Sequence, residues 1–288
     1  MRASPDDVHS RPGTGYMQAR STLALPSALD PAHAGRWLRL AEDGGVVFLD
    51  YDGTLTPIVA RPELATLPDG MRQTLRRLAE RLPVAVVSGR DAAVVAGLVG
   101  MDGLAYVGSH GLDITGFGDG TARHEAAREF VPRLDAAEQE LRRATAGIPG
   151  VLVERKRFSV ATHVRLAAPA ARTAVESIVE RIGRAHPSLR RERGKMVFEL
   201  RPDIDWDKGR AVCWLLEALG RDWSAALFIG DDLTDETVFR ALAGRGLGIV
   251  VSEAGRPTAA DLRLANPAEV QTLLGRLADA AAAAAERG

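Results

Sequence analysis

Short runs of apolar, often β-branched residues recur along the chain from position 46, without alternating polar residues. They read VVFL (46–49), VAVV (84–87), AYVG (105–108), ALFI (226–229) and LGIVV (247–251). Strands that are buried on both faces of a parallel sheet have this pattern. Between the first two runs, apolar residues recur at helical spacing at Met71, Leu75, Leu78 and Leu82. The pattern predicts an α/β core with a doubly wound, Rossmann-like parallel sheet.

The middle of the chain has a different pattern. Helical spacing near 125–145 and 170–185 accompanies two stretches in which polar and apolar residues partly alternate, one around Lys156 and one at 189–202. Paired antiparallel strands with helices on one face form an α+β module. We therefore expect a core formed by 28–112 plus 200–288, interrupted by an inserted α+β domain at 113–199.

The first 27 residues are rich in Pro, Gly, Ser and charged residues, which predicts a disordered tail over 1–27. No continuous apolar segment follows the basic residues there, and no stretch of the chain approaches the ~20 apolar residues of a membrane span. A single cysteine, Cys213, excludes a disulfide within the chain and a multi-cysteine zinc site. These features favour a monomeric, cytoplasmic protein without a membrane partner.

The charges are nearly balanced, with 37 Lys and Arg against 38 Asp and Glu. This balance argues against an electrostatic surface for nucleic acid or for an anionic membrane. Only three of the basic residues are lysines, at Lys156, Lys195 and Lys208. In a chain that prefers arginine so strongly, a lysine can mark a position where a guanidinium does not replace the compact ammonium group.

Acids and hydroxyls follow three of the predicted strands. The segments are DYDGTLT (50–56), SGR (88–90) and GDDLTDE (230–236). The carboxyl ends of parallel strands lie at the same edge of a sheet, so these segments are expected to converge on one crevice. Several aspartates in one crevice repel one another unless a cation is present. Hard oxygen ligands without nearby His or Cys indicate Mg²⁺.

These residue types fit phosphoryl transfer through a covalent intermediate. A carboxylate can attack phosphorus and form an aspartyl-phosphate, which requires a metal, donors for the phosphate oxygens and a second acid. Ser88 and nearby backbone N–H groups can hold phosphate oxygens, and Lys208 can neutralise charge. Each part alone has an ordinary explanation as a turn or a helix cap, but the combination at strand ends favours a catalytic site.

DYDGTLT, SGR, DWDKG (205–209) and GDDLTDE together resemble the four motifs of the haloacid dehalogenase superfamily of aspartate-dependent phosphatases. The resemblance implies that Asp50 is the nucleophile and that Asp52 is the general acid and then the general base. Thr54, Ser88 and Lys208 would contact the phosphoryl group. The implied Mg²⁺ ligands are Asp50, the backbone carbonyl of Asp52 and Asp231, with Asp232 and Asp235 in the outer coordination shell.

The inserted domain lies between SGR and DWDKG, the position of the type-2 cap in that superfamily. Such a cap closes over the crevice, excludes water and contacts the leaving group. Four segments resemble the trehalose-6-phosphate phosphatase family: GSHG (108–111), VERKR (153–157), THVR (162–165) and GKMVFELRP (194–202). The implied substrate contacts are Gly89, Arg90, His110, Glu154, Lys156, His163, Arg165, Lys195 and Glu199. Arg155 departs from the family, which more often has a small polar residue there.

This resemblance implies an Mg²⁺-dependent phosphatase that hydrolyses trehalose 6-phosphate to trehalose and phosphate. Its substrate would come from a separate trehalose-6-phosphate synthase. A disaccharide presents many hydroxyl groups, so carboxylates as acceptors and lysines as donors suit its recognition.

Other functions use similar residues. One alternative keeps the mechanism and changes the substrate to sucrose phosphate, a glycosyl-glycerate phosphate or another sugar phosphate. A second is a phosphomutase, which would require a bisphosphate activator. A third is a receiver-type signalling module, but in that class the acidic pair precedes the phospho-acceptor aspartate and there is no cap.

Overall fold

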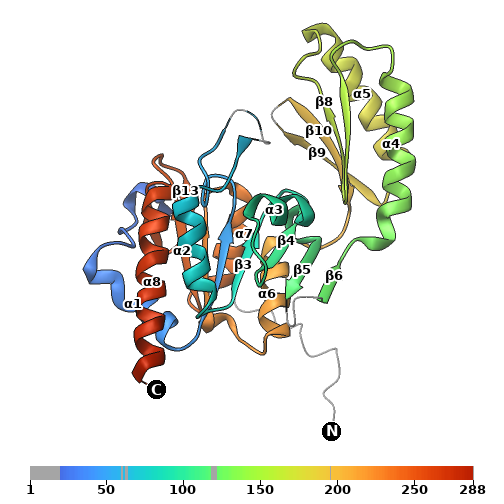
Figure 1. Cartoon of the computed structure of the whole chain (residues 1–288). Helices are drawn as coiled ribbons and strands as arrows, with labels where there is room; N and C mark the ends of the chain where they lie inside the picture. The colour runs from blue at the N-terminus through green and yellow to red at the C-terminus, as the bar shows by residue number, and fades with distance from the viewer. Residues whose placement is uncertain (1–19, 60, 62–63, 118–121, 195, 288) are drawn as a thin grey trace.

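Residues 20–59, 61, 64–117, 122–194 and 196–287 are described by the computed structural model of the chain (Figure 1). Its largest sheet has eight strands in the order β14-β12-β11-β2-β3-β4-β5-β6. Each of the apolar runs forms a strand: β2 (Val46–Asp50), β3 (Val84–Val87), β4 (Ala105–Gly108), β11 (Ala226–Gly230) and β12 (Leu247–Val251). Together with β14 (Leu262–Leu264) they are parallel, which confirms the predicted parallel sheet.

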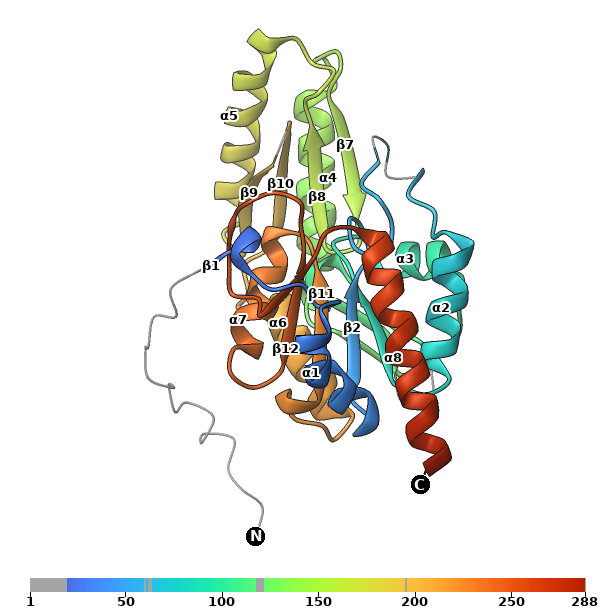
Figure 2. The same ribbon diagram turned by 90° about the vertical axis from the view of Figure 1, so that its left-hand side faces the viewer.

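Helices cover both faces of this sheet (Figures 1 and 2). One face packs against α1 (Pro31–Glu42), α2 (Asp69–Ala79), α3 (Ala92–Val99) and α8 (Pro267–Arg287), and the other against α6 (Lys208–Ala218) and α7 (Glu236–Leu242). Successive residues of β2 alternate between these cores: Val47 and Leu49 face the first, whereas Val46 and Phe48 face the second. The doubly wound architecture is therefore confirmed.

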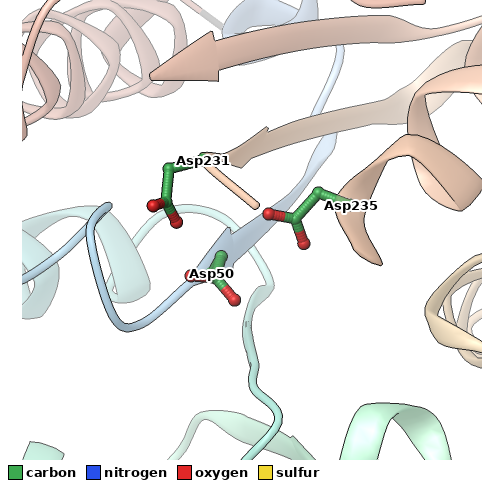
Figure 3. Close-up of side chains that lie close together, drawn as sticks. All are labelled: Asp50, Asp231 and Asp235. Atoms are coloured by element: carbon green, nitrogen blue, oxygen red, sulfur yellow. The ribbon is translucent and has the colours of Figure 1, made fainter. Parts of the chain in front are cut away.

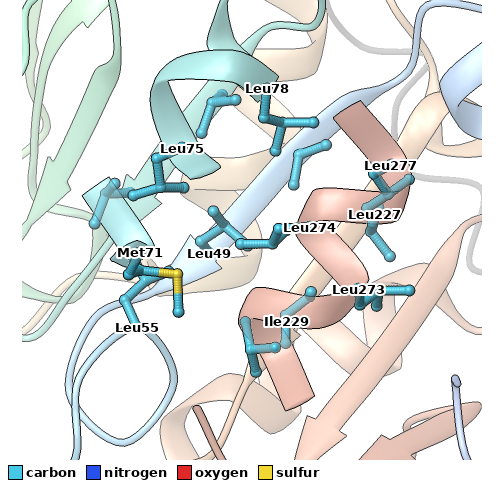
Figure 4. Close-up of a cluster of buried hydrophobic side chains, with 14 of the residues drawn as sticks. Leu49, Leu55, Met71, Leu75, Leu78, Leu227, Ile229, Leu273, Leu274 and Leu277 are labelled. Atoms are coloured by element: carbon cyan, nitrogen blue, oxygen red, sulfur yellow. The ribbon is translucent and has the colours of Figure 1, made fainter. Parts of the chain in front are cut away.

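The first of these cores explains the helical spacing between the first two strands. Met71, Leu75 and Leu78 are buried on one side of α2, and Leu82 is buried just beyond it. Figure 4 shows this side of α2 next to three strand residues and three residues of α8, namely Leu49, Leu227, Ile229, Leu273, Leu274 and Leu277. Burying a leucine contributes about 1.5–3 kcal/mol relative to exposing it, so this packing holds α2 and α8 against the sheet.

A second sheet forms the predicted inserted module. Its antiparallel order is β7-β8-β10-β9, with β7 (Leu152–Lys156), β8 (Ser159–His163), β9 (Leu189–Gly194) and β10 (Val197–Pro202). α4 (Val131–Thr145) and α5 (Pro169–Ala185) cover one face of this sheet and share a separate apolar core with it. Figure 1 shows both helices on the side away from the larger sheet. No helix among the described residues covers the other face of the cap sheet, which is called the open face below.

Strand pairing differs from the predicted domain limits on both sides of the cap. β5 (Asp113–Phe117) and β6 (Ala122–Glu125) fall within the predicted cap, yet they extend the larger sheet, with β5 antiparallel to β4 and β6 antiparallel to β5. Ile114 of β5 is completely buried in the second core, which explains this placement. At the other end, β10 continues to Pro202 in the cap sheet, beyond the predicted limit at 200.

The predicted tail divides into two parts. Residues 1–19 lie outside the described residues, whereas 20–27 are part of the fold, which corrects the prediction for this stretch. β1 (Arg20–Ser21) pairs with β13 (Pro257–Thr258), and Leu25 is buried in the second core. Short 3₁₀ helices lie at Thr22–Ala24 (η2), Ser109–Gly111 (η4), Arg128–Phe130 (η5), Trp223–Ala225 (η6) and Leu233–Asp235 (η7). None of the described helices is long and apolar enough to cross a membrane.

Candidate active site

Three aspartates meet at the carboxyl ends of the central strands. Asp50 is the last residue of β2, and Asp231 directly follows β11, which pairs with β2 in parallel. Asp235 closes η7, one turn further along. One carboxylate oxygen from each of the three lies within 4.8 Å of the others, and Figure 3 shows the side chains pointing toward a common centre. The structure thus brings together the strand-end acids that the sequence placed in one crevice.

Lys208 joins two of these acids. It is the first residue of α6, and its Nζ donates to Oδ1 of Asp50 at 2.7 Å and to Oδ1 of Asp235 at 2.6 Å. All three side chains are buried. Burial alone would lower the pKa of Lys208, but the carboxylates of Asp50 and Asp235 outweigh burial and raise that pKa above its ordinary value. Lys208 therefore stays charged beside Asp50.

The acids fit a hard divalent cation. Within the described part of the chain, the buried Oδ1 of Asp231 has no hydrogen-bond partner. Burial, and then the charges of Asp235 and Asp232, raise the pKa of Asp231 to about 7, and burial raises the pKa of Asp50 well above its ordinary value. An unpaired carboxylate oxygen and an excess of negative charge are what Mg²⁺ would compensate. Asp50 and Asp231 are the residues placed to hold it.

The two predicted outer-shell acids have different surroundings. The carboxylate of Asp235 accepts from Lys208 and, through Oδ2, from the backbone N–H of Asp232 at 2.9 Å. Asp232 is exposed and caps η7, with Oδ1 accepting from the N–H of Leu233 at 2.7 Å. Asp232 is not among the three clustered carboxylates. The outer-shell roles of both residues, and the ligand role of the Asp52 carbonyl, stay predictions.

Two hydroxyls lie beside the acids at the strand ends. Thr54 is completely buried, and its Oγ1 has no hydrogen-bond partner among the residues described. Ser88 is also buried at the end of β3, where its Oγ accepts from the backbone N–H of Arg90 at 3.1 Å. Because each hydroxyl proton has no acceptor within the described protein, both groups are free to donate to a phosphate oxygen.

Arg90 pairs with the predicted general acid. Its Nε and Nη2 donate to Oδ2 and Oδ1 of Asp52, each at 2.6 Å, which is a bidentate pair. The structure places the guanidinium of Arg90 on Asp52, and its contact with substrate stays a prediction. The side chain of Asp52 is 39% exposed, so it is open to the crevice. Nothing in the sequence pairs these two residues, which lie 38 positions apart.

The open face of the cap carries most of the predicted sugar contacts. Residues at alternate positions of a strand point to opposite faces, and Val153, Val160 and Phe198 belong to the helix-covered core. Their neighbours therefore point to the open face: Glu154 and Lys156 on β7, Ser159 and His163 on β8, and Glu199 and Arg201 on β10. Arg165 is exposed just beyond β8, and Lys195 lies outside the described residues.

Hydrogen bonds order this face. Oε1 of Glu199 accepts from Ser159 Oγ at 2.5 Å and from Lys156 Nζ at 3.3 Å. Burial would raise the pKa of Glu199, but Lys156, Ser159 and Arg201 outweigh burial and hold that pKa below its ordinary value. Glu154 and His163 form a second pair, with Oε2 and Nε2 2.7 Å apart. The face thus presents the Glu199 carboxylate beside the Lys156 cation, and the Glu154 carboxylate beside His163.

A cavity of 310 Å³ lies between the open face and the core. His110, Trp206 and Lys208 line it from the core, and Arg190, Glu192 and Arg201 line it from the cap. These three cap residues were not predicted from the sequence, although Arg201 is two positions after Glu199 in one strand and so shares its face. Burial, and then the nearby cations, lower the pKa of His110 well below its ordinary value, which keeps its imidazole neutral.

A family model described as trehalose-phosphatase matches residues 48–268. The chain belongs to the trehalose-phosphatase family. It is 42% identical over 283 residues to the trehalose-phosphate phosphatase of Mycobacterium marinum, covering 96% of this chain and 70% of that protein. It is 44% identical over 239 residues to the trehalose-phosphate phosphatase of Mycobacterium tuberculosis, covering 81% of this chain but only 61% of that protein.

Solved structures of the family have the same fold. The C-terminal domain of the trehalose-6-phosphate phosphatase of C. albicans matches with a TM-score of 0.69 at 25% identity, covering 88% of this chain and 99% of that one. A trehalose-6-phosphate phosphatase related protein matches with the same TM-score at 26% identity, covering 81% and 97%. These matches confirm the family predicted from the motifs.

The departure from the family at Arg155 has a structural explanation. Arg155 lies between Glu154 and Lys156 on β7, so its side chain points to the helix-covered face. There its Nε and Nη2 donate to Oδ1 of Asp135 on α4, at 3.0 and 2.8 Å. Arg155 therefore links strand to helix within the cap and leaves the open face to its neighbours.

The tip of the β7–β8 hairpin joins the cap to the core. The backbone N–H of Arg157 donates to Oδ2 of Asp91, directly ahead of α3, at 2.9 Å. Phe158 is completely buried, in a cluster that includes Leu112 and Trp206. This part of the cap is anchored beside the SGR segment.

The raised pKa of Asp231 predicts that the stability of the metal-free protein depends on pH. Its pKa rises from 3.8 to about 7 on folding, so the folded state binds the extra proton between these values. Stability conferred by that proton is lost as pH increases through this window. Relative to Asp231→Asn, the metal-free wild type should therefore lose unfolding free energy from pH 5 to pH 8, as measured by urea unfolding in EDTA. Parallel curves for the two proteins would contradict this assignment.

Proposed function

We propose that this protein is an Mg²⁺-dependent phosphatase that hydrolyses trehalose 6-phosphate to trehalose and phosphate through an aspartyl-phosphate on Asp50. One observation carries the proposal: a buried Asp50–Lys208 pair lies at the strand ends, beneath a cap face that presents carboxylates and cations. Phosphoryl transfer through an aspartyl-phosphate requires the buried Asp50–Lys208 pair, and a leaving group rich in hydroxyls suits the charged cap face. Relatives named as trehalose-phosphate phosphatases support the substrate assignment.

In the first step, an Asp50 oxygen attacks phosphorus and the bond from phosphorus to the sugar oxygen breaks. Lys208 bonds to Asp50, opposes the effect of burial on its pKa and orients its carboxylate, while the hydroxyls of Thr54 and Ser88 donate to phosphate oxygens. Asp52 gives its proton to the departing sugar oxygen. Asp50 and Asp231 would hold Mg²⁺, which would supply positive charge to offset the negative charge of the phosphate.

In the second step, water attacks the phosphorus of the aspartyl-phosphate. Asp52, now a carboxylate, takes a proton from that water, and the bond between phosphorus and Asp50 breaks to release phosphate. Arg90 occupies both oxygens of Asp52 in the structure, so it gives up one hydrogen bond whenever Asp52 is protonated. Arg90 thus orients Asp52 in both steps.

The cap selects the substrate. Glu154 and Glu199 accept hydrogen bonds from sugar hydroxyls, and Lys156 donates to them. With its substrate supplied by a separate synthase, the enzyme acts as a monomer in the cytoplasm, where a reducing environment suits its lone cysteine.

A panel of phosphate esters tests the substrate. Phosphate release would be measured on trehalose 6-phosphate, sucrose 6-phosphate, a glycosyl-glycerate phosphate and glucose 6-phosphate, each with Mg²⁺ and with EDTA. We expect the highest kcat/KM for trehalose 6-phosphate and no turnover in EDTA. Equal rates on glucose 6-phosphate and trehalose 6-phosphate would overturn the substrate assignment. Conservation of total ester phosphate, with a bisphosphate requirement, would identify a phosphomutase.

Glu199→Gln tests recognition by the cap. A hydrogen bond to a charged group is worth about 1.5–3 kcal/mol, so kcat/KM for trehalose 6-phosphate should fall about 10- to 100-fold. Hydrolysis of p-nitrophenyl phosphate, which lacks a sugar, should be unchanged. Glu176→Gln is the matched control, because Glu176 pairs with Arg191 and Arg193 on the helix-covered face. Equal losses on both substrates would show that Glu199 does not contact the sugar.

A further inference from the structure

Arg256 holds the backbone of the segment that contains Asp231. It lies between β12 and β13, and its Nη2 donates to the carbonyl oxygen of Asp231 at 2.7 Å and to that of Asp232 at 3.4 Å. Its Nη1 donates to Oε1 of Glu236 at 2.7 Å. The side chain is 20% exposed, so these bonds are largely shielded from water. One guanidinium therefore contacts both ends of the Asp231–Glu236 segment.

Glu236 ties the same segment to the following loop a second time. It directly follows Asp235 and begins α7, and its side chain is 9% exposed. Its Oε2 accepts from the backbone N–H of Ala259 at 2.9 Å. Both oxygens of Glu236 are thus bonded to residues 256–259, which fixes this loop against the acidic segment.

Thr22 in turn fixes Arg256. The N–H of Thr22 donates to the carbonyl of Arg256 at 2.9 Å, and the N–H of Arg256 donates to Oγ1 of Thr22 at 3.1 Å. That hydroxyl donates onward to the carbonyl of Ala254 at 2.5 Å, and Thr22 is completely buried. Thr22 lies ahead of residues 48–268, the region that the family model matches.

We propose that Arg256 is a positioning residue for the metal ligand Asp231, and that Thr22 holds Arg256 in place. Oδ1 of Asp231 has no hydrogen-bond partner in the described protein, whereas its backbone carbonyl accepts from Arg256. Arg256 orients that backbone through the carbonyl oxygen. Partners beyond the metal ligands commonly set metal affinity in this way. The inference rests on the proposed metal site.

Mg²⁺ binding to Arg256→Met tests the proposal. Calorimetric titration of EDTA-treated, dialysed protein with Mg²⁺ should give a Kd about 10- to 100-fold above wild type, the usual effect of losing such a partner. Arg245→Met is the matched control, because Arg245 also donates to a backbone carbonyl, that of Ala241, away from the acids. Its Mg²⁺ affinity should equal that of wild type. A folded Arg256→Met protein with wild-type affinity would overturn the proposal.

Two milder variants keep the test decisive if Arg256→Met does not fold. Arg256→Lys keeps the charge but lacks the two-pronged guanidinium. Its Mg²⁺ affinity should be lower than that of wild type and, if Arg256→Met folds, higher than that of Arg256→Met. Thr22→Val keeps the shape but loses two hydrogen bonds, and its Mg²⁺ affinity should fall several-fold. Wild-type affinity in both would overturn the inference.

The same titrations separate this inference from the proposed function. If wild type releases phosphate from trehalose 6-phosphate but none of the Arg256 and Thr22 variants changes Mg²⁺ affinity, the function stands and the inference fails. If these variants weaken Mg²⁺ binding while wild type does not hydrolyse trehalose 6-phosphate, the inference stands and the substrate assignment fails. Wild type that binds no Mg²⁺ would overturn the metal site and the inference together.

Discussion

Asp50→Asn should lower kcat by about 10⁴-fold or more, on the scale of nucleophile removal in other covalent enzymes. An amide keeps the shape of the carboxylate but does not supply the attacking oxygen. Burial raises the pKa of Asp50, so the folded state disfavours its charge, and a neutral side chain should leave the thermal midpoint unchanged or higher. Steady-state phosphate release and thermal unfolding measure the two effects. Turnover near the wild-type rate would rule out the aspartyl-phosphate.

A chemical measurement provides the control for this variant. Acid quenching of wild type during turnover, followed by digestion and mass spectrometry, should find phosphate on the peptide that contains Asp50. The same peptide from Asp50→Asn should carry none. Phosphate on another acidic residue of wild type would assign the nucleophile elsewhere.

Lys208→Met should lose both stability and activity. Lys208 is 2% exposed and bonds to two buried carboxylates, which its removal leaves without a cation. Breaking a buried ion pair from one side costs about 3–5 kcal/mol, so urea unfolding at pH 8 should show a loss of that size. Without Lys208 to oppose the effect of burial and to orient Asp50 beside the phosphate, kcat should fall by about 10³-fold or more, on the scale of removing a preorganised electrostatic group.

The stability loss should narrow as pH falls, because burial raises the pKa of Asp50 and a protonated Asp50 no longer needs a cation. Lys156→Met is the matched control: Lys156 is 33% exposed, and its pair with Glu199 should contribute at most about 1 kcal/mol. An equal loss in the two variants, or a Lys208→Met loss that does not change with pH, would contradict the role given to the buried triad.

The parallel core and its catalytic edge were predictable because they depend on local patterns. A buried strand reads as an apolar run, and parallel strands bring the residues after them to one edge. That rule places Asp50 and Asp231 together without knowledge of the loops. The cap limits were harder to predict, since β5 and β6 pair antiparallel like cap strands, and only the burial of Ile114 in the core shows where they belong.

Contacts made by arginine side chains were not predictable. The fork from Arg90 to Asp52 and the contacts of Arg256 with the acidic segment both join residues that are distant in the sequence. In a chain this rich in arginine, no local pattern separates these two from residues on a solvated surface. The face on which Arg155 lies was predictable, because alternation along β7 places it on the helix side, although its charge is the same as that of Lys156.

The anchored hairpin tip has a consequence for how the cap would move. Arg157 and Phe158 hold the tip to the core, so a rotation of the cap that keeps these contacts would pivot there. Lys156 and Ser159, next to the pivot, keep nearly constant positions, whereas Glu154 lies about 7 Å further along the strand and His163 further still. Lys156 and Ser159 would therefore move little when the cap rotates, whereas Glu154 and His163 would move most. A ligand that contacts Glu154 and His163 would limit how far the cap rotates.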